Sequence, residues 1–242
     1  MSRIILVSNR LPIRLADGGK PVRTTGGLAS ALEGAGVLDE AIWVGWPGVS
    51  SAELEENPAM GESLAELGVV PVSLSAAEME GFYEGYSNST LWPLLHQMLD
   101  RARFESGWAE AYRAANERFA EAVLRVAKEG DTVWVHDYHL FLLPELLREA
   151  LPGLRIGFFP AHAVPQQRHR ARAAGAGGDP WGGLLGADLI GFHTYNYLRH
   201  FRSALLRVLG VESEVDSLGT PGARCGSASI LSGTTTGDSR RS

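Results

Sequence analysis

The sequence predicts an α/β fold built on a doubly wound, mostly parallel, Rossmann-like sheet. Short apolar runs typical of buried strands alternate with helical patterns along the chain, and such alternation indicates βαβ units. A second observation is the polar segment His-Asp-Tyr-His at 136–139, which directly follows the apolar run 132–135. The carboxyl ends of strands are where ligands bind in open α/β sheets. The sequence therefore predicts both the fold class and a candidate site at one edge of the sheet.

Six strands and three helices are expected. The strands are Ile4–Val7, Ala41–Val44, Val69–Val72, Thr132–Val135, Arg155–Phe159 and Ala187–Phe192. The helices are Trp108–Lys128, Phe141–Ala150 and Tyr195–Leu209. The first helix has the clearest pattern, because its apolar residues recur at helical spacing along one stripe. Pro152-Gly153 and Gly210 end the other two.

The composition changes abruptly at Leu218, which we take as the domain boundary. Residues 1–218 are expected to form one domain, within which 160–183 is an aberrant loop rich in Arg, Ala and Gly. Residues 219–242 are rich in Gly, Ser, Thr and Arg and have almost no apolar content, so this tail is expected to be disordered.

Bulk properties exclude several classes of function. A net charge of −6 argues against a nucleic-acid surface or a polybasic membrane anchor. No apolar run approaches the length of a membrane span, and the N-terminal apolar run is too short for a signal peptide. The single Cys225 excludes an internal disulfide framework and fits a reducing cytoplasm.

Two segments could bind phosphate. Arg10 follows the first strand and could hold a phosphate with two parallel hydrogen bonds, although a surface arginine is the default interpretation. Gly26-Gly27 precedes a helical run, where glycines let the backbone approach a phosphate, and a flexible turn is an equal alternative. No G-x-G-x-x-G or Walker motif is present, which disfavours a dinucleotide or ATP site.

The polar segment and the loop aromatics each allow two interpretations. Asp137 could bind a sugar hydroxyl or act as a base, and it could equally cap the helix that follows. His136 and His139 have metal-ligand spacing, but no third ligand is evident, so a metal site is disfavoured. Aromatics near loops, Trp43 among them, can stack on sugars, yet most aromatics are core, and we expect Trp43 to be core.

Seven segments in order carry a resemblance to a known family. They are Ser8–Pro12, Thr25–Leu28, Trp43–Gly48, Tyr86–Pro93, Trp134–His139, Arg155–Phe159 and Leu184–Tyr195. The chain resembles the N-terminal half of trehalose-6-phosphate synthases of glycosyltransferase family 20, over roughly 1–159 and 184–218. The resemblance implies the N-terminal, acceptor-binding domain of a GT-B fold, with the C-terminal donor domain missing. It also implies transfer of glucose from UDP-glucose to glucose 6-phosphate with retention of configuration, without a metal or cofactor.

The resemblance also assigns residues to the two substrates. Arg10 would contact the phosphate of glucose 6-phosphate, with Tyr83 and Trp92 beside it. Trp46 and Asp137 would line the acceptor sugar. Gly26 and Gly27 would approach the diphosphate of the UDP-glucose donor.

The chain departs from the family after Phe159. The family has a cleft histidine at the position of Ala161, and here a histidine stands one position later, at His162. Plausible codons for 160–170, read one base later, give LHTPFPSSDI, which is the loop that the family carries. We therefore hypothesise compensating frameshifts over about 160–181 and another near Leu218, a hypothesis that resequencing the locus tests.

Three functions follow as hypotheses. The first is a truncated trehalose-6-phosphate synthase that lacks synthase activity alone. The second is a non-catalytic module that binds a sugar phosphate. The third, a nucleotide-dependent oxidoreductase, is disfavoured by the missing glycine fingerprint, and the fold alone does not choose between them.

Overall fold

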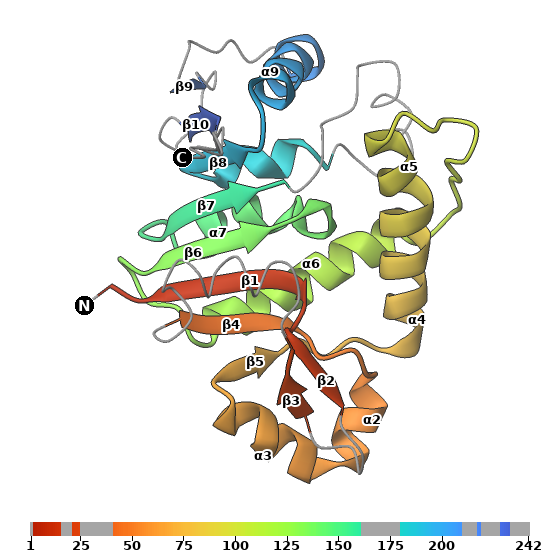
Figure 1. Cartoon of the computed structure of the whole chain (residues 1–242), viewed down its shortest axis with the longest axis vertical. Helices are drawn as coiled ribbons and strands as arrows, with labels where there is room; N and C mark the ends of the chain where they lie inside the picture. The colour runs from red at the N-terminus through yellow and green to blue at the C-terminus, as the bar shows by residue number, and fades with distance from the viewer. Residues whose placement is uncertain are drawn as a thin grey trace, which may run out of the picture.

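The chain forms an α/β domain around one eight-stranded sheet (Figure 1). The computed structural model describes residues 2–15, 21–24, 41–160, 180–209, 217–218 and 228–232. In sheet order the strands are β5 (Val69–Pro71), β4 (Ala41–Trp46), β1 (Ile4–Arg10), β6 (Thr132–His136), β7 (Arg155–Phe159), β8 (Leu189–Phe192), β10 (Ala228–Ser232) and β9 (Ser217–Leu218). Neighbouring strands run parallel, except that β9 is antiparallel to β10.

The order of the strands places a topological switch point between β1 and β6. From β1 the chain builds outward to β4 and β5 on one side, and then to β6, β7 and β8 on the other. This is the doubly wound arrangement of Rossmann-like domains, in which ligands bind where the strand order reverses. The predicted fold class is confirmed.

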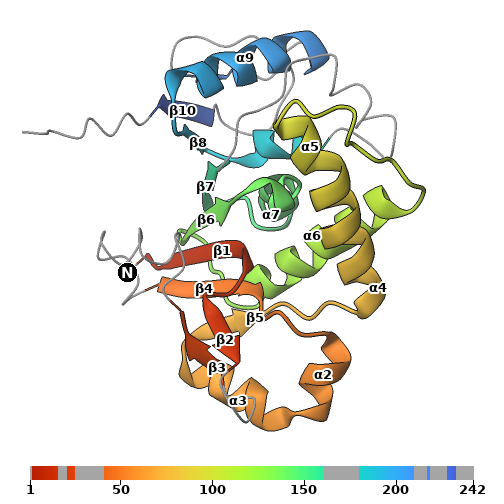
Figure 2. The ribbon, with the colours of Figure 1, turned by 45° about the vertical axis from the view of Figure 1, so that its right-hand side comes forward.

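The helices cover both faces of the sheet and its carboxyl edge (Figures 1 and 2). They are α2 (Ser51–Glu56), α3 (Pro58–Glu66), α4 (Ala76–Met79), η1 (Glu80–Leu91), α5 (Trp92–Leu95), α6 (Trp108–Leu124), η2 (Tyr138–Leu140), α7 (Leu143–Ala150), η4 (Gly182–Gly186) and α9 (Tyr195–Leu209). A small antiparallel hairpin, β2 (Ile13–Leu15) and β3 (Pro21–Arg23), follows β1. Within the described ranges, no helix has the length and apolar character needed to cross a bilayer.

Alternating residues of the central strands supply two apolar layers. Ile5 and Val7 of β1 belong to the larger core, which α6 and α7 cover. Leu6 of β1 points to the other face, where it joins Trp43 and the helix α3. Successive side chains of a strand point to opposite faces of the sheet, and here both faces are buried. These strands are therefore continuous apolar runs in the sequence. Trp43 is a core residue, as expected.

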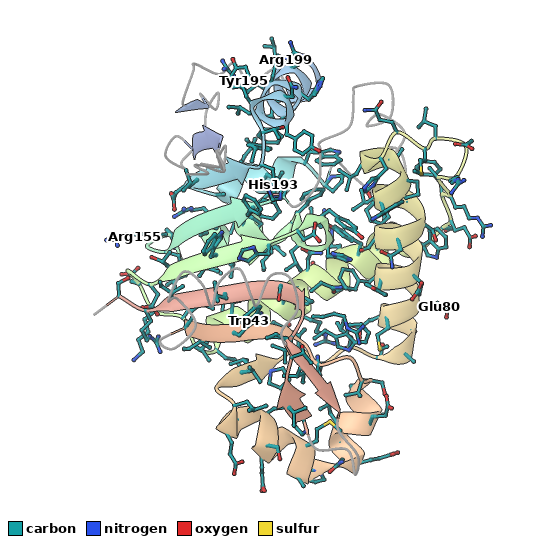
Figure 3. All side chains as sticks on the ribbon, in the orientation of Figure 1. Trp43, Glu80, Arg155, His193, Tyr195 and Arg199 are labelled. Carbon is teal, nitrogen blue, oxygen red and sulfur yellow. The ribbon has the colours of Figure 1, made fainter. Side chains whose placement is uncertain are left out.

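One long helix stands across the carboxyl ends of the central strands. The segments α4, η1 and α5 join into a single helix over residues 76–95, and the arrowheads of β1, β6 and β7 point toward it in Figure 1. Side chains fill the space between this helix and the sheet in Figure 3, whereas the labelled Glu80 points outward. The helix therefore closes one side of the edge where the candidate residues lie.

The structure differs from the sequence-based expectation at several boundaries. The expected helix 108–128 ends at Leu124, and the expected helix 141–150 begins at Leu143. Residues 228–232 of the expected disordered tail form β10, which pairs with β8. Its sequence Ala-Ser-Ile-Leu-Ser is the most apolar run of that tail, which accounts for the difference. The rest of 219–242 lies outside the described residues, and the boundary at Leu218 stays a prediction.

Candidate functional site

Three of the predicted site residues lie at the carboxyl ends of adjacent strands around the switch point. Arg10 is the last residue of β1, Trp46 is the last residue of β4, and Asp137 directly follows β6. The register pairs Arg10 with Trp46 across β1 and β4. The arrangement matches the general location of ligand sites in doubly wound sheets.

Arg10 lies with its guanidinium over the indole of Trp46. Its Cζ atom is 4.9 Å from the ring centroid, a distance at which a cation is attracted to the π face. Gly48 has φ +92°, and a Cβ there would lie 2.5 Å from Arg10 Nη2. The glycine thus allows the backbone to turn and leaves room for the guanidinium. Arg10 is exposed, so its outer face is open to an anion.

The strand end that carries Arg10 is held by two side-chain hydrogen bonds. The register of β1 with β4 shifts between Val7 and Arg10. There the Trp43 indole nitrogen donates to Ser8 Oγ at 2.7 Å, and Ser8 Oγ donates to the Arg10 carbonyl at 2.8 Å. A bulge of this kind re-aims a side chain, and these bonds fix where Arg10 points.

A row of aromatic rings in contact leads from Trp46 into the polar segment after β6. Trp46 and Tyr83 have ring centroids 5.8 Å apart. Tyr83 is stacked on His139 at 5.6 Å, and His139 is stacked on Tyr138 at 4.0 Å. Trp46 is buried and its indole nitrogen donates to the Val49 carbonyl at 2.8 Å. We call this row the aromatic wall. Trp46, Tyr138 and His139 are buried, whereas Tyr83 is half-buried, so Tyr83 is the ring that can pack against a sugar.

Asp137 is held with its carboxylate beside this wall. Its Oδ1 accepts from the Tyr138 backbone N–H at 2.8 Å, and its own N–H donates to the Phe159 carbonyl at 3.0 Å. Its Oδ2 lies 3.8 Å from His139 Nδ1. The capping interpretation is therefore correct for one oxygen. The side chain is 27% exposed, so the carboxylate can still accept hydrogen bonds from a ligand.

The backbone of Asp137 is strained. Its φ is 75° and its ψ is 165°, a region that essentially only glycine adopts without cost. Strain of about 1–3 kcal/mol at such positions is typical of functional sites. The carboxylate is thus kept at a position where glycine would be the more stable residue.

This strain predicts an unusual order of stability for two variants. Asp137→Ala removes the carboxylate and keeps the strain, whereas Asp137→Gly removes both. We expect Asp137→Gly to be the more stable by about 1–2 kcal/mol, after allowance for the greater freedom of glycine in the unfolded chain. Urea unfolding of the two proteins measures the difference, and equal stabilities would show that the backbone is relaxed.

The two histidines of the segment point into different surroundings. His136 packs against Trp134, with centroids 4.8 Å apart, and is only 4% exposed. His139 lies between two tyrosine rings. In the part of the chain that the structure describes, no group of three or more His, Cys, Asp or Glu side chains is arranged to hold a metal ion. Both histidines have structural surroundings that account for them.

Burial makes His136 a neutral residue at physiological pH. Desolvation lowers its pKa to about 4, although the charge of Asp137 opposes the shift. Its Nε2 atom is buried and has no hydrogen-bond partner among the described residues. The unfolded chain takes up this proton near pH 6.5, so it binds more protons than the folded protein between about pH 4 and 6.5.

Acidification should therefore destabilise the protein through His136. The free energy of unfolding is expected to fall by about 3 kcal/mol on this account as the pH drops from 7 to 4. His136→Phe keeps a planar ring and has no proton to bind, so it serves as the matched reference. The difference in stability between wild type and His136→Phe should shift by this amount over that range. A difference that is independent of pH would contradict the buried neutral imidazole.

The winding of the long helix places Tyr83 and the predicted site residue Trp92 on the same side of that helix. The segment η1 is a π-helix of 12 residues, and the Trp92 N–H donates to the Ser87 carbonyl. At about 4.4 residues per turn for i→i+5 bonding, nine residues make about two full turns. In an α-helix of about 3.6 residues per turn, Tyr83 and Trp92 would lie on opposite sides.

Trp92 nevertheless stands apart from the aromatic wall. It is 36% exposed and stacks on His96, with centroids 3.8 Å apart. The ring contacts of the described residues join Trp46 with Tyr83 but do not extend to Trp92. The structure thus brings Arg10, Trp46, Tyr83 and Asp137 into one connected set and leaves Trp92 at its margin.

Three predicted positions lie outside the described residues. Gly26 and Gly27 belong to one undescribed range, and Ala161 and the hypothesised frameshifted loop belong to another. Their roles stay predictions.

The sequence assigns no role to three polar residues that the structure places beside this set: Tyr138, Asn88 and Tyr112. Tyr138 donates from its phenol to Asn88 Oδ1 at 3.0 Å, which links the segment after β6 to the long helix. Tyr112 in α6 donates to the Tyr138 carbonyl at 2.7 Å and accepts from the Phe141 N–H at 3.0 Å. Tyr138 and Asn88 lie in two of the segments that carry the family resemblance, but nothing in their spacing indicates that they are in contact.

The arrangement suits a ligand that is both anionic and rich in hydroxyls. An exposed guanidinium with a planar fork is well matched to a phosphate. The half-buried Tyr83 ring of the aromatic wall offers an apolar face, and the Asp137 carboxylate offers acceptor oxygens to hydroxyl groups. These three elements together fit a phosphorylated sugar.

Comparisons with known proteins agree on one family. Residues 2–229 match the model of glycosyltransferase family 20. The matched region extends beyond Leu218, the predicted domain boundary. The bifunctional trehalose-6-phosphate synthase/phosphatase of Thermoproteus tenax is 42% identical over 234 residues, which cover 89% of this chain and 30% of the relative. The α,α-trehalose-phosphate synthase [UDP-forming] 1 of Aspergillus fumigatus is 43% identical over 220 residues, covering 87% of this chain and 42% of the relative.

Solved structures give the same result for the fold. An α,α-trehalose-phosphate synthase (UDP-forming) from Burkholderia xenovorans in complex with glucose 6-phosphate superposes with a TM-score of 0.75 at 25% identity, covering 96% of this chain and 49% of that one. The N-terminal domain of a Candida albicans trehalose-6-phosphate phosphatase gives a TM-score of 0.73 at 27% identity, covering 95% and 47%. The chain thus spans less than half the length of these relatives.

Proposed function

Because this chain belongs to glycosyltransferase family 20, we propose that it supplies the acceptor side of a UDP-forming α,α-trehalose-phosphate synthase. The reaction of the whole enzyme would transfer glucose from UDP-glucose to glucose 6-phosphate with retention of configuration. The observation that carries the proposal is the exposed Arg10 guanidinium on Trp46, next to the aromatic wall and Asp137 at the switch point.

Each described residue has a chemical role in this proposal. Arg10 binds the phosphate of glucose 6-phosphate through charge-assisted hydrogen bonds. Trp46 and Tyr83 form the wall beside the sugar, and Trp92 adds to it at the margin. The Asp137 carboxylate accepts hydrogen bonds from sugar hydroxyls, so it orients the acceptor in the crevice.

The donor side is proposed from the resemblance alone. Gly26 and Gly27 would let the backbone approach the diphosphate of UDP-glucose, as glycines before a helix do at other phosphate sites. The residues that bind the rest of the donor would lie in the part of the relatives that this chain does not match. We therefore expect the 242-residue chain to bind glucose 6-phosphate without synthase activity. The lone Cys225 supports a location in the reducing cytoplasm.

A second candidate function is a sugar-phosphate-binding module without catalysis. One observation favours it: the same fold occurs as the N-terminal domain of a trehalose-6-phosphate phosphatase. The fold therefore does not by itself require a synthase reaction.

Two measurements on the purified chain test the proposal. Calorimetry should show binding of glucose 6-phosphate and weaker binding of glucose, because glucose lacks the phosphate that Arg10 holds. An assay for UDP release with UDP-glucose and glucose 6-phosphate should give no signal above background. Release of UDP would contradict the expected lack of activity. A chain that binds glucose and glucose 6-phosphate equally would contradict the role of Arg10.

A further inference from the structure

Asn88 is connected to the aromatic wall through Tyr138. It lies five positions after Tyr83, which is about one turn of a π-helix, so the two residues share one side of η1. Tyr83 stacks on His139 and His139 stacks on Tyr138. The Tyr138 phenol donates a hydrogen bond to Asn88 Oδ1. The contacts therefore form a closed circuit between the long helix and the segment after β6.

The hydrogen bond with Tyr138 determines which way the Asn88 amide faces. Burial and the nearby charge of Asp137 raise the pKa of the Tyr138 phenol, so it keeps its proton and donates to Oδ1 at 3.0 Å. An amide group has its acceptor oxygen and its two N–H donors on opposite branches. With Oδ1 engaged, the N–H donors of Asn88 are directed away from the phenol.

These donors are available to a ligand. Asn88 is half-buried, and its Nδ2 atom donates to no other group among the described residues. Asp137 lies at the other end of Tyr138, where its carboxylate accepts from the Tyr138 backbone N–H. Tyr138 thus lies between the Asp137 carboxylate, which only accepts hydrogen bonds, and the Asn88 amide, which has N–H donors.

We propose that Asn88 binds the acceptor sugar through its amide N–H donors and that Tyr138 is the positioning residue that orients this amide. A sugar hydroxyl both donates and accepts hydrogen bonds, so hydroxyl groups can donate to Asp137 and accept from Asn88. The inference rests on the proposed function, since it names a further ligand of the same acceptor site. It assigns Asn88 to the sugar and leaves the phosphate to Arg10.

Two variants separate ligand binding by Asn88 from a purely structural role. Asn88→Asp keeps an oxygen that accepts from Tyr138 but has no N–H donor. Asn88→Ala removes the whole group. Calorimetry of the full 242-residue chain should show that both variants bind glucose 6-phosphate about three- to tenfold more weakly than wild type. Ser89→Ala, one position along the same helix, is the matched control and should bind as wild type does.

The positioning role of Tyr138 has its own readout. Tyr138→Phe keeps the stacked ring and removes the hydroxyl that donates to Asn88, so we expect glucose 6-phosphate to bind about two- to threefold more weakly. Binding of inorganic phosphate should be unchanged in Asn88→Ala and Tyr138→Phe, because neither variant alters Arg10. A variant that had lost the folded site would lose both ligands, and thermal unfolding without ligand checks this directly.

The outcomes distinguish this inference from the proposed function. If wild type binds glucose 6-phosphate and Asn88→Asp binds it equally well, Asn88 serves only to hold Tyr138 and the inference is wrong. If the phosphate-only ligand is weakened as much as glucose 6-phosphate in Asn88→Ala, the assignment to the sugar is wrong. If wild type itself binds no glucose 6-phosphate, the proposed function fails first and the inference fails with it.

Discussion

Replacing Arg10 by alanine is expected to weaken glucose 6-phosphate binding by about 100-fold or more. The side chain would make two charge-assisted hydrogen bonds to the phosphate, each worth about 1.5–3 kcal/mol. Arg10→Lys should recover only part of the loss, since an ammonium cannot form the planar fork or stack in the same way on Trp46. Calorimetry on the three proteins measures the effect.

The effect of Arg10→Ala should be confined to binding. Arg10 is exposed, and the loss of its cation–π contact with Trp46 is expected to cost no more than about 1 kcal/mol. The melting temperature without ligand is therefore expected to stay close to that of wild type. If the alanine variant binds glucose 6-phosphate as wild type does, Arg10 is not part of the binding site.

Tyr112→Phe is expected to cost about 2–4 kcal/mol of folding free energy, although it removes a single oxygen atom. The Tyr112 hydroxyl donates to the Tyr138 carbonyl and accepts from the Phe141 N–H. Tyr112 is 1% exposed, so its loss removes a hydrogen bond from each of two buried backbone groups, at a cost of about 1–3 kcal/mol for each. Urea unfolding measures the change.

Tyr112→Phe should also weaken ligand binding at the candidate site. The two bonds fix the turn that places Tyr138 and His139 beside Tyr83, so glucose 6-phosphate should bind more weakly to Tyr112→Phe at temperatures where it is still folded. Tyr195, which is 58% exposed in α9, offers the matched control, and Tyr195→Phe should leave stability within about 0.5 kcal/mol. If the two variants were equally stable, the turn would be held by its apolar contacts alone.

The sheet could be predicted because its strands are buried on both faces. Each expected strand overlaps an observed one, from β1 to β8, since continuous apolar runs leave few alternatives. The helices α2 and α4 were not predicted, although Ser50-x-x-Glu53 and Ser75-x-x-Glu78 form capping boxes in the structure. That motif is visible in a sequence and could have located both helix starts.

The site could be predicted only in part. The positions of Asp137 and Arg10 follow from their places after apolar strands, whereas Trp46 is assigned to the site only by the family resemblance. The π-helix could not be foreseen, because the sequence of η1 gives no signal that distinguishes i→i+5 from i→i+4 bonding. Without it, Tyr83 and Trp92 would be placed on opposite sides of a helix, and Asn88 would have no reason to be considered.

A crystal structure of the chain with glucose 6-phosphate would show where the acceptor binds. We expect the phosphate to lie within hydrogen-bond distance of the Arg10 guanidinium and the sugar to lie beside Tyr83, with its hydroxyls toward Asp137. A sugar phosphate bound away from the ends of β1 and β6, or one whose phosphate points away from Arg10, would contradict the claim that this edge is the acceptor site.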